Sequence, residues 1–151
     1  MTLSQMKIIK LIPVLNKKVK ECDKTIIDDI NKTFLTIDES SKILYKREIK
    51  LLINSSNLKT QSFFLEIIDE ISDSIIPSSE KKVYKYTFLL NRVIESRQSP
   101  KIVTEVYNDL DKLTFPGDTE EFNFYELLVR VALLNKDENL VKQILEKMQN
   151  L

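Results

Sequence analysis

The sequence has no histidine and no tryptophan, and it has one cysteine and one glycine among 151 residues. Without histidine, Cys22 has no partner for Cys-His catalysis, no Ser-His-Asp triad can form, and no His/Cys set is present for a zinc site. A single glycine, Gly117, is too few for the glycine-rich loops that bind ATP or dinucleotides. The composition therefore excludes the commonest enzyme chemistries, and we expect a non-enzyme with no cofactor and no metal.

An excess of one charge and long apolar runs are also missing. Lys and Arg total 23 and Asp and Glu total 23, so the formal net charge is zero. A neutral chain has no overall field for a polyanion, which disfavours nucleic acid as the partner. No apolar stretch reaches the ~18–20 residues that cross a bilayer, and the lone Cys22 cannot form an internal disulfide. We therefore expect no membrane span and a cytoplasmic protein, in the host cytoplasm if the gene is viral or from a phage.

Apolar residues recur at helical spacing along almost the whole chain, and no segment alternates as a strand would. Hydrophobic residues make up 42% of the sequence, enough for the core of one domain. The pattern predicts an all-α protein of about eight helices, near 4–21, 24–35, 39–54, 59–74, 79–97, 100–113, 119–134 and 138–150.

Several polar residues and prolines are placed to begin or interrupt these helices. Side chains of Asp and Ser accept hydrogen bonds from the free amides of a first helical turn, and proline fits the first helical position. We expect caps at Asp23, Asp38 and Asp137, a capping box formed by Asp118 and Glu121, a helix start at Ser99-Pro100, and a kink or restart at Pro13.

The chain also resembles itself. Sliding 84–110 onto 122–148 aligns Leu89-Leu90 with Leu127-Leu128, Arg92-Val93 with Arg130-Val131 and Val103 with Val141. An offset of 39 aligns Tyr45-Lys46 with Tyr84-Lys85 and Pro77 with Pro116. Stacked helix pairs bury apolar faces that one pair cannot bury alone. We predict one domain, 1–151, built as a short α-solenoid of four antiparallel hairpins near 4–37, 38–77, 78–117 and 118–151. The alternative is a compact helical bundle, since amphipathic helices also align by chance.

The last unit has the order helix, short polar turn, helix. It runs from Phe124-Tyr125-Glu126-Leu127-Leu128 through Asn135-Lys136-Asp137-Glu138 to Ile144-Leu145-Glu146-Lys147-Met148. Over about 83–150 this resembles a tetratricopeptide or pentatricopeptide repeat, although the unit is longer and the tetratricopeptide Trp, Gly and Ala positions are not present. The resemblance implies a helical-repeat architecture and transfers no binding residue.

Two arginines fall at one repeat position on successive hairpins. If Arg92 and Arg130 face a groove, with Tyr86 and Tyr125 beside them, they form a cationic ladder for an acidic peptide or phosphates. The alternative is that both arginines bridge to neighbouring acids such as Glu95. Adjacent acid pairs such as Asp28-Asp29 point about 100° apart on a helix, which argues against catalysis. We expect Tyr84, Phe122 and Phe124 in the core.

These observations predict a protein–protein interaction module, such as an inhibitor, adaptor or immunity-type protein, that binds another protein through a groove or helix face. Three alternatives stay open: single-stranded RNA binding of pentatricopeptide type, a viral helical-bundle inhibitor, and membrane-surface binding by the Lys-rich segment 1–20. Residues 1–60 hold 12 basic and 7 acidic side chains and 61–151 hold 11 and 16. This asymmetry could orient a partner or promote head-to-tail self-association, and the alternative is an ordinary solvated surface.

Overall fold

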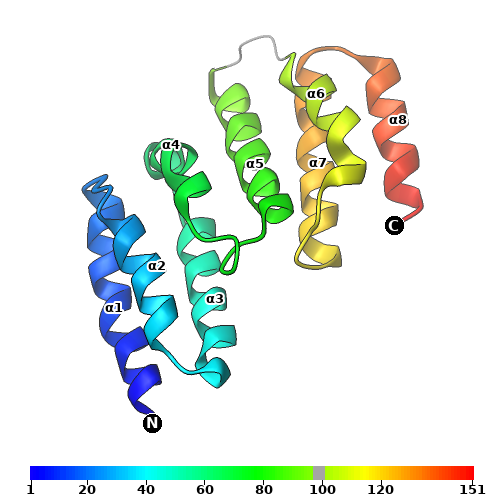
Figure 1. Cartoon of the computed structure of the whole chain (residues 1–151). Coiled ribbons are helices and arrows are strands. Elements are labelled where there is room, and N and C mark those ends of the chain that lie inside the picture. The colour runs from blue at the N-terminus through cyan, green and yellow to red at the C-terminus, as the bar shows by residue number, and fades with distance from the viewer. Residues whose placement is uncertain (97–100) are drawn as a thin grey trace. The chain divides into compact units, whose positions relative to one another are not determined.

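The computed structural model describes residues 1–96 and 101–151, and the regular structure in these ranges is entirely helical (Figure 1). The prediction of an all-α protein is confirmed. The α-helices are α1 (Leu3–Lys20), α2 (Ile26–Thr36), α3 (Glu39–Asn54), α4 (Leu58–Ile67), α5 (Ser78–Ser96), α6 (Ile102–Asp109), α7 (Asp118–Leu134) and α8 (Glu138–Gln149), and two 3₁₀ turns follow α4 and α6: η1 (Ile68–Glu70) and η2 (Leu110–Lys112).

The chain divides into two compact units, Met1–Ser78 and Ser79–Leu151. The division falls within one residue of the predicted boundary between the second and third hairpins. Residues 1–78 hold 12 basic and 11 acidic side chains, and residues 79–151 hold 11 and 12. The charge asymmetry about residue 60 therefore nearly vanishes between the units, because 61–78 contain four acids and no base. The single domain, the four-hairpin stack and self-association stay predictions.

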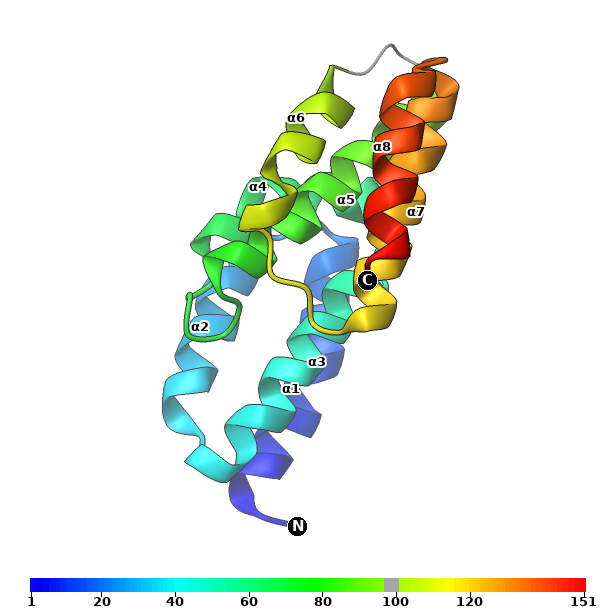
Figure 2. The same cartoon turned by 90° about the vertical axis from the view of Figure 1, so that its right-hand side faces the viewer.

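In the first unit, α1 packs against α2, α3 and α4. The chain ascends in α1, descends in α2 and ascends again in α3, so α1 and α3 run parallel (Figures 1 and 2). Isoleucine and leucine side chains from every helix fill the core, and Tyr45 of α3 is fully buried with its ring stacked 6.0 Å from Phe34 of α2. The Tyr45 hydroxyl donates to the Ile30 carbonyl over 2.6 Å.

One amide side chain joins α2 to the segment that follows η1. The Asn31 amide nitrogen donates to the Glu70 carbonyl, and its oxygen accepts from the Ser72 N–H, each over 2.9 Å. Both bonds join residues about forty positions apart in the sequence. Asn31 therefore supplies hydrogen-bond partners for two backbone groups at the end of η1, where the helical hydrogen bonds stop.

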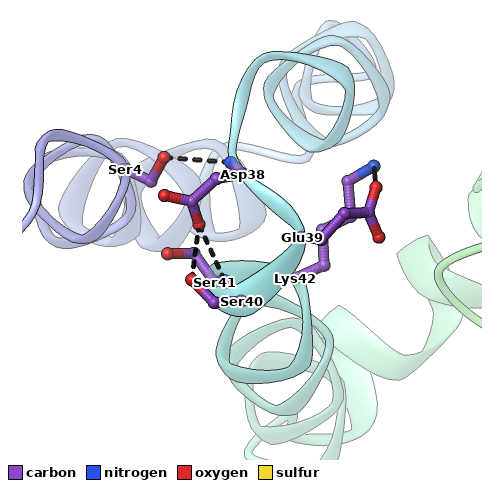
Figure 3. A network of polar contacts seen from close by, with 6 residues as sticks. All are labelled: Ser4, Asp38, Glu39, Ser40, Ser41 and Lys42. Atoms are coloured by element: carbon purple, nitrogen blue, oxygen red, sulfur yellow. Dashed lines mark hydrogen bonds and ion pairs between the residues drawn. The ribbon is translucent and has the colours of Figure 1, made fainter.

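A polar network links the first turn of α1 to the start of α3 (Figure 3). The Ser4 hydroxyl, which is buried, accepts from the Asp38 N–H over 3.0 Å. The Asp38 carboxylate accepts from the Ser41 N–H over 2.9 Å and from the Ser40 hydroxyl over 3.0 Å. Beside it, Lys42 forms an ion pair with Glu39 and lies over the Phe34 ring. The network caps α3 and fixes α1 next to it.

The predicted caps meet different outcomes. Asp38 caps α3, and Asp137 caps α8 by accepting from the Leu140 N–H over 3.1 Å. The prediction for Asp23 is wrong, because its carboxylate binds the Thr25 N–H and hydroxyl while α2 begins at Ile26 without a side-chain cap. The capping box of Asp118 and Glu121 is also wrong: Asp118 is already the first helical residue of α7, and Gly117 holds the cap position with no side chain to offer.

The structure tests one of the two proline predictions and shows that two predicted helices end early. Pro13 lies inside the continuous helix α1, so the predicted restart does not occur. Burial of Ile8 and Leu15, on either side of Pro13, holds the helix together across the missing hydrogen bond. Ser99-Pro100 lies outside the described residues. The predicted helices 59–74 and 100–113 end earlier as α-helix, at 67 and 109, because each tightens into a 3₁₀ turn.

The second unit has its own core, made by α5, α6, α7 and α8. Tyr84 and Phe124 are buried, as predicted, and the Phe115 ring packs 5.2 Å from Phe124. Phe122 is 48% exposed, so its predicted place in the core is wrong. Successive helical positions turn by about 100°, and the core-facing side of α7 falls to Phe124, Tyr125 and Leu128.

Candidate binding groove

An apolar groove of about 420 Å³ runs between the parallel helices α1 and α3. Figure 2 shows the two helices side by side. The groove is lined by Ile8, Ile9, Ile12 and Pro13 of α1 and by Leu44 and Glu48 of α3. We refer to it as the α1–α3 groove.

Exposed apolar side chains of both helices border the α1–α3 groove. Ile9 is 53% exposed, and Met6, three residues before it on α1, is also exposed. Leu51 of α3 is 50% exposed and lies two helical turns beyond Leu44, on the same side of the helix. Exposed apolar groups gathered around a concave surface are typical of binding sites.

One charged hydrogen-bond acceptor lies in this apolar groove, and a backbone carbonyl of α1 beside it lacks its ordinary helical donor. The Glu48 carboxylate is half-buried and makes no hydrogen bond or ion pair with any residue that the structure describes. Pro13 has no backbone N–H, so the Ile9 carbonyl lacks the donor that the fourth residue on would otherwise supply. The groove therefore presents the Glu48 carboxylate to whatever occupies it.

Basic side chains lie along both edges of the groove. Lys10, Lys17 and Lys20 stand three, four and seven residues from Pro13, which places them on or beside the same side of α1. Arg47 lies three residues after Leu44 on α3. Within residues 1–96 and 101–151, Lys10, Lys20 and Arg47 form no ion pair, and Lys17 reaches only Glu21, at 4.0 Å.

Polar contacts hold α1 at both ends. At its start, Ser4 binds Asp38, and hydrogen bonds from Ser41 and Ser40 lower the pKa of the Asp38 carboxyl below its ordinary value. Near its end, Lys18 donates to Asp29 of α2, and this hydrogen bond raises the pKa of Lys18. These contacts join the start of α1 to the start of α3 and the end of α1 to α2.

The four residues predicted to bind a partner all lie in the second unit. Tyr86 of α5 donates to Asp109 of α6; its burial and this bond raise its pKa to about 12. Tyr125 is buried in the core, and burial raises its pKa. Arg92 of α5 and Arg130 of α7 are exposed. The two arginines are therefore exposed, Tyr86 is half-buried and Tyr125 is buried, and the binding role of the four stays a prediction.

The α1–α3 groove was not predicted from the sequence, although a signal for it is present. Residues 8–15, around Pro13, are almost all apolar. The apolar part of the helix surface is therefore broader there than the single stripe that packs against one core. Ile8 and Leu15 meet the core, while Ile9 and Pro13 face outward. The surplus apolar width of this segment is the feature that indicates a second contact.

In the described part of the chain, no helix is long and apolar enough to cross a membrane. The same residues contain no group of three or more His, Cys, Asp or Glu side chains placed to hold a metal ion. Comparison with known protein families, curated proteins and solved structures finds no match to this chain.

Proposed function

We propose that this protein is a non-enzymatic protein-binding module whose α1–α3 groove receives a segment of another protein. The observation that carries the proposal is the groove itself, which joins exposed apolar side chains to the Glu48 carboxylate, an acceptor that lacks a partner among the described residues. Desolvating Ile9 and Leu51 in an interface would supply hydrophobic free energy. By covering a surface of its target, such a module would act as an inhibitor, an adaptor or an immunity-type protein.

The chemistry of the groove favours protein over RNA. Proteins that bind single-stranded RNA without sequence preference commonly stack bases on exposed aromatic rings. Helix α1 has no aromatic residue, and the only aromatic residue of α3, Tyr45, is fully buried. An apolar surface without stacking rings suits the side chains of a protein.

The test is capture of the partner with matched variants. Ile9→Asp places a charge in the groove at a side chain that is 53% exposed, and Leu133→Asp makes the same kind of change at 59% exposure in the second unit. Wild-type protein and Leu133→Asp should retain the same partner from an extract of the source organism, and Ile9→Asp should lose it. Circular dichroism should show that both variants are folded. Retention of the partner by Ile9→Asp would refute the proposal.

RNA binding by Arg92 and Arg130 is tested separately. Fluorescence anisotropy against mixed RNA oligomers at low salt should show no tight binding by the wild-type protein. Tight binding that weakens with salt and disappears in the Arg92→Ala, Arg130→Ala double variant would replace the proposal with the pentatricopeptide-type alternative.

A further inference from the structure

We infer that the occupant of the α1–α3 groove is an amphipathic helix of the partner protein, with acidic residues along both edges of its apolar face and one arginine or lysine at the centre of that face. This inference rests on the proposed function and specifies the chemistry of the partner.

The form of the groove favours a helix. Two parallel helices leave a straight trough between them, and a third helix packs into such a trough through side chains one turn apart. Ile9 and Pro13 on one wall and Leu44 and Glu48 on the other are each four residues apart, which is about one turn. A helix satisfies its own backbone hydrogen bonds, whereas an extended peptide would bring unpaired amides into a mostly apolar groove.

The charges at the edges favour acidic residues on the occupant. Lys10, Lys17 and Lys20 lie along the α1 side and Arg47 along the α3 side. Helix α1 contains five lysines and no acidic residue. A helix lying between these edges therefore meets positive charge on both sides, which stabilises Asp or Glu there and repels Lys or Arg.

The centre of the groove has the opposite preference. The Glu48 carboxylate is an acceptor, and covering it with an apolar side chain would remove its water without replacing the hydrogen bonds. An arginine supplies several N–H groups and a lysine three, so either can donate to this carboxylate. The occupant therefore carries one basic residue among its apolar ones.

An anionic membrane surface fits these observations less well. Helix α1 already buries Ile8, Leu15 and Val19 in the core of the first unit, so its widest apolar side is not available to lipid. Insertion of the remaining exposed apolar groups would also bring the Glu48 carboxylate toward hydrocarbon, which is costly. Binding to anionic vesicles is one of the outcomes that the experiment distinguishes.

The test uses the full chain and a series of labelled peptides of about 18 residues, or five helical turns. The reference peptide has a leucine face, glutamate edges and a central arginine. Its relatives have glutamine edges, lysine edges, or methionine in place of the arginine. In fluorescence anisotropy, the reference peptide should bind about tenfold or more tightly than the glutamine-edged and methionine peptides, and the lysine-edged peptide should not bind.

Variants of the protein locate the effect. Reversing the charge of Lys10, Lys17 and Lys20 to Glu should transfer the preference to the lysine-edged peptide. A control with the same change in net charge, Lys82, Lys101 and Lys142 to Glu in the second unit, should keep the wild-type order. Glu48→Gln should abolish the advantage of arginine over methionine, and Ile9→Asp should abolish binding of every peptide.

Three results would overturn the inference: equal binding of the glutamate- and glutamine-edged peptides, transfer of preference by the control variant, or binding to phosphatidylserine vesicles with no binding to any peptide. These results are separable from failure of the proposed function. If Ile9→Asp loses the captured partner while the peptides show no charge order, only the inference fails. If Ile9→Asp keeps the partner, the proposed function fails.

Discussion

Tyr45 of α3 donates its hydroxyl hydrogen to the backbone carbonyl of Ile30 in α2 over 2.6 Å, and both residues are fully buried. The bond joins two helices at the centre of the first unit, next to Leu44 in the groove wall. Burial raises the pKa of the Tyr45 hydroxyl, so the donor hydrogen is retained far above neutral pH. The hydrogen bond between Tyr45 and Ile30 therefore lies behind the α3 wall of the groove, inside an otherwise apolar core.

Removing this hydroxyl should destabilise the first unit modestly. Tyr45→Phe keeps the ring and its stacking on Phe34, and loses only the hydrogen bond to Ile30. We expect the free energy of unfolding to fall by about 1 kcal/mol, as for a typical buried hydrogen bond. Urea denaturation followed by circular dichroism measures the change. Tyr45→Ala, which also leaves a cavity, should cost about 3–5 kcal/mol; equal losses in the two variants would contradict the assignment.

The link between Ser4 and Asp38 should matter more than its exposed neighbour. Ser4→Ala leaves the Asp38 N–H without its partner beside a buried position, which we expect to cost about 1–2 kcal/mol of unfolding free energy. Ser40→Ala removes a hydrogen bond from an exposed hydroxyl and should cost less. Urea midpoints of the two variants provide the comparison, and a larger loss in Ser40→Ala would contradict the role given to Ser4.

Asp38 should make stability depend on pH in acid. Hydrogen bonds from Ser41 and Ser40 hold its pKa in the folded protein below the ordinary value of 3.8. The folded state therefore favours the charged carboxylate, and this contribution is complete above the ordinary value and is lost as the pH falls through the lowered one. Asp38→Asn retains a capping oxygen but cannot ionise.

The measurement is the urea midpoint of wild type and Asp38→Asn at a series of pH values from 7 down to about 3. The difference between the two proteins should stay constant above about pH 5 and shrink as the solution becomes more acidic. A difference that grows on acidification would show that the carboxyl is favoured in its protonated form.

Glycine should stabilise the ends of α1 and α7. Cys22 and Lys136 have φ of 53° and 57°, in the left-handed region. In both turns the following N–H, of Asp23 or Asp137, bonds back to the last helical turn. Side chains with a Cβ are strained in this conformation, so Cys22→Gly and Lys136→Gly should each raise the unfolding free energy by about 0.5–1 kcal/mol. Cys22→Ala is the control, and equal stability of Cys22→Gly and Cys22→Ala would count against the strain.

The helices could be predicted because the evidence for them is local. Apolar spacing identified all eight, and Asp38 and Asp137 were found as caps because a cap needs only the residues that follow it. The prediction for Asp118 was wrong because α7 begins one residue earlier than expected. Gly117 therefore holds the cap position, and Asp118 is the first helical residue. The exposure of Phe122 could not be deduced, since Phe122 and Phe124 point about 200° apart on α7 and apolar spacing alone does not say which of them meets the core.

The groove could not be predicted because it depends on which helices become neighbours. Ile9 and Leu44 are 35 residues apart, and nothing in either segment states that α1 and α3 lie side by side. Ser4 and Asp38, whose contact helps to hold α1 beside α3, are also far apart in the sequence, at 34 positions. The broad apolar surface near Pro13 indicates that α1 makes more than one contact. It does not indicate which helix or partner makes the second contact.

Pro13 gives α1 a mechanical property that an unbroken helix lacks. The bond missing at Ile9 is where helices bend most easily. The two halves of α1 are anchored independently, the first through Ser4 to Asp38 and the second through Lys18 to Asp29. We therefore expect α1 to bend more readily near Pro13 than at its attached ends, which would let the width of the groove vary with the side chains of its occupant.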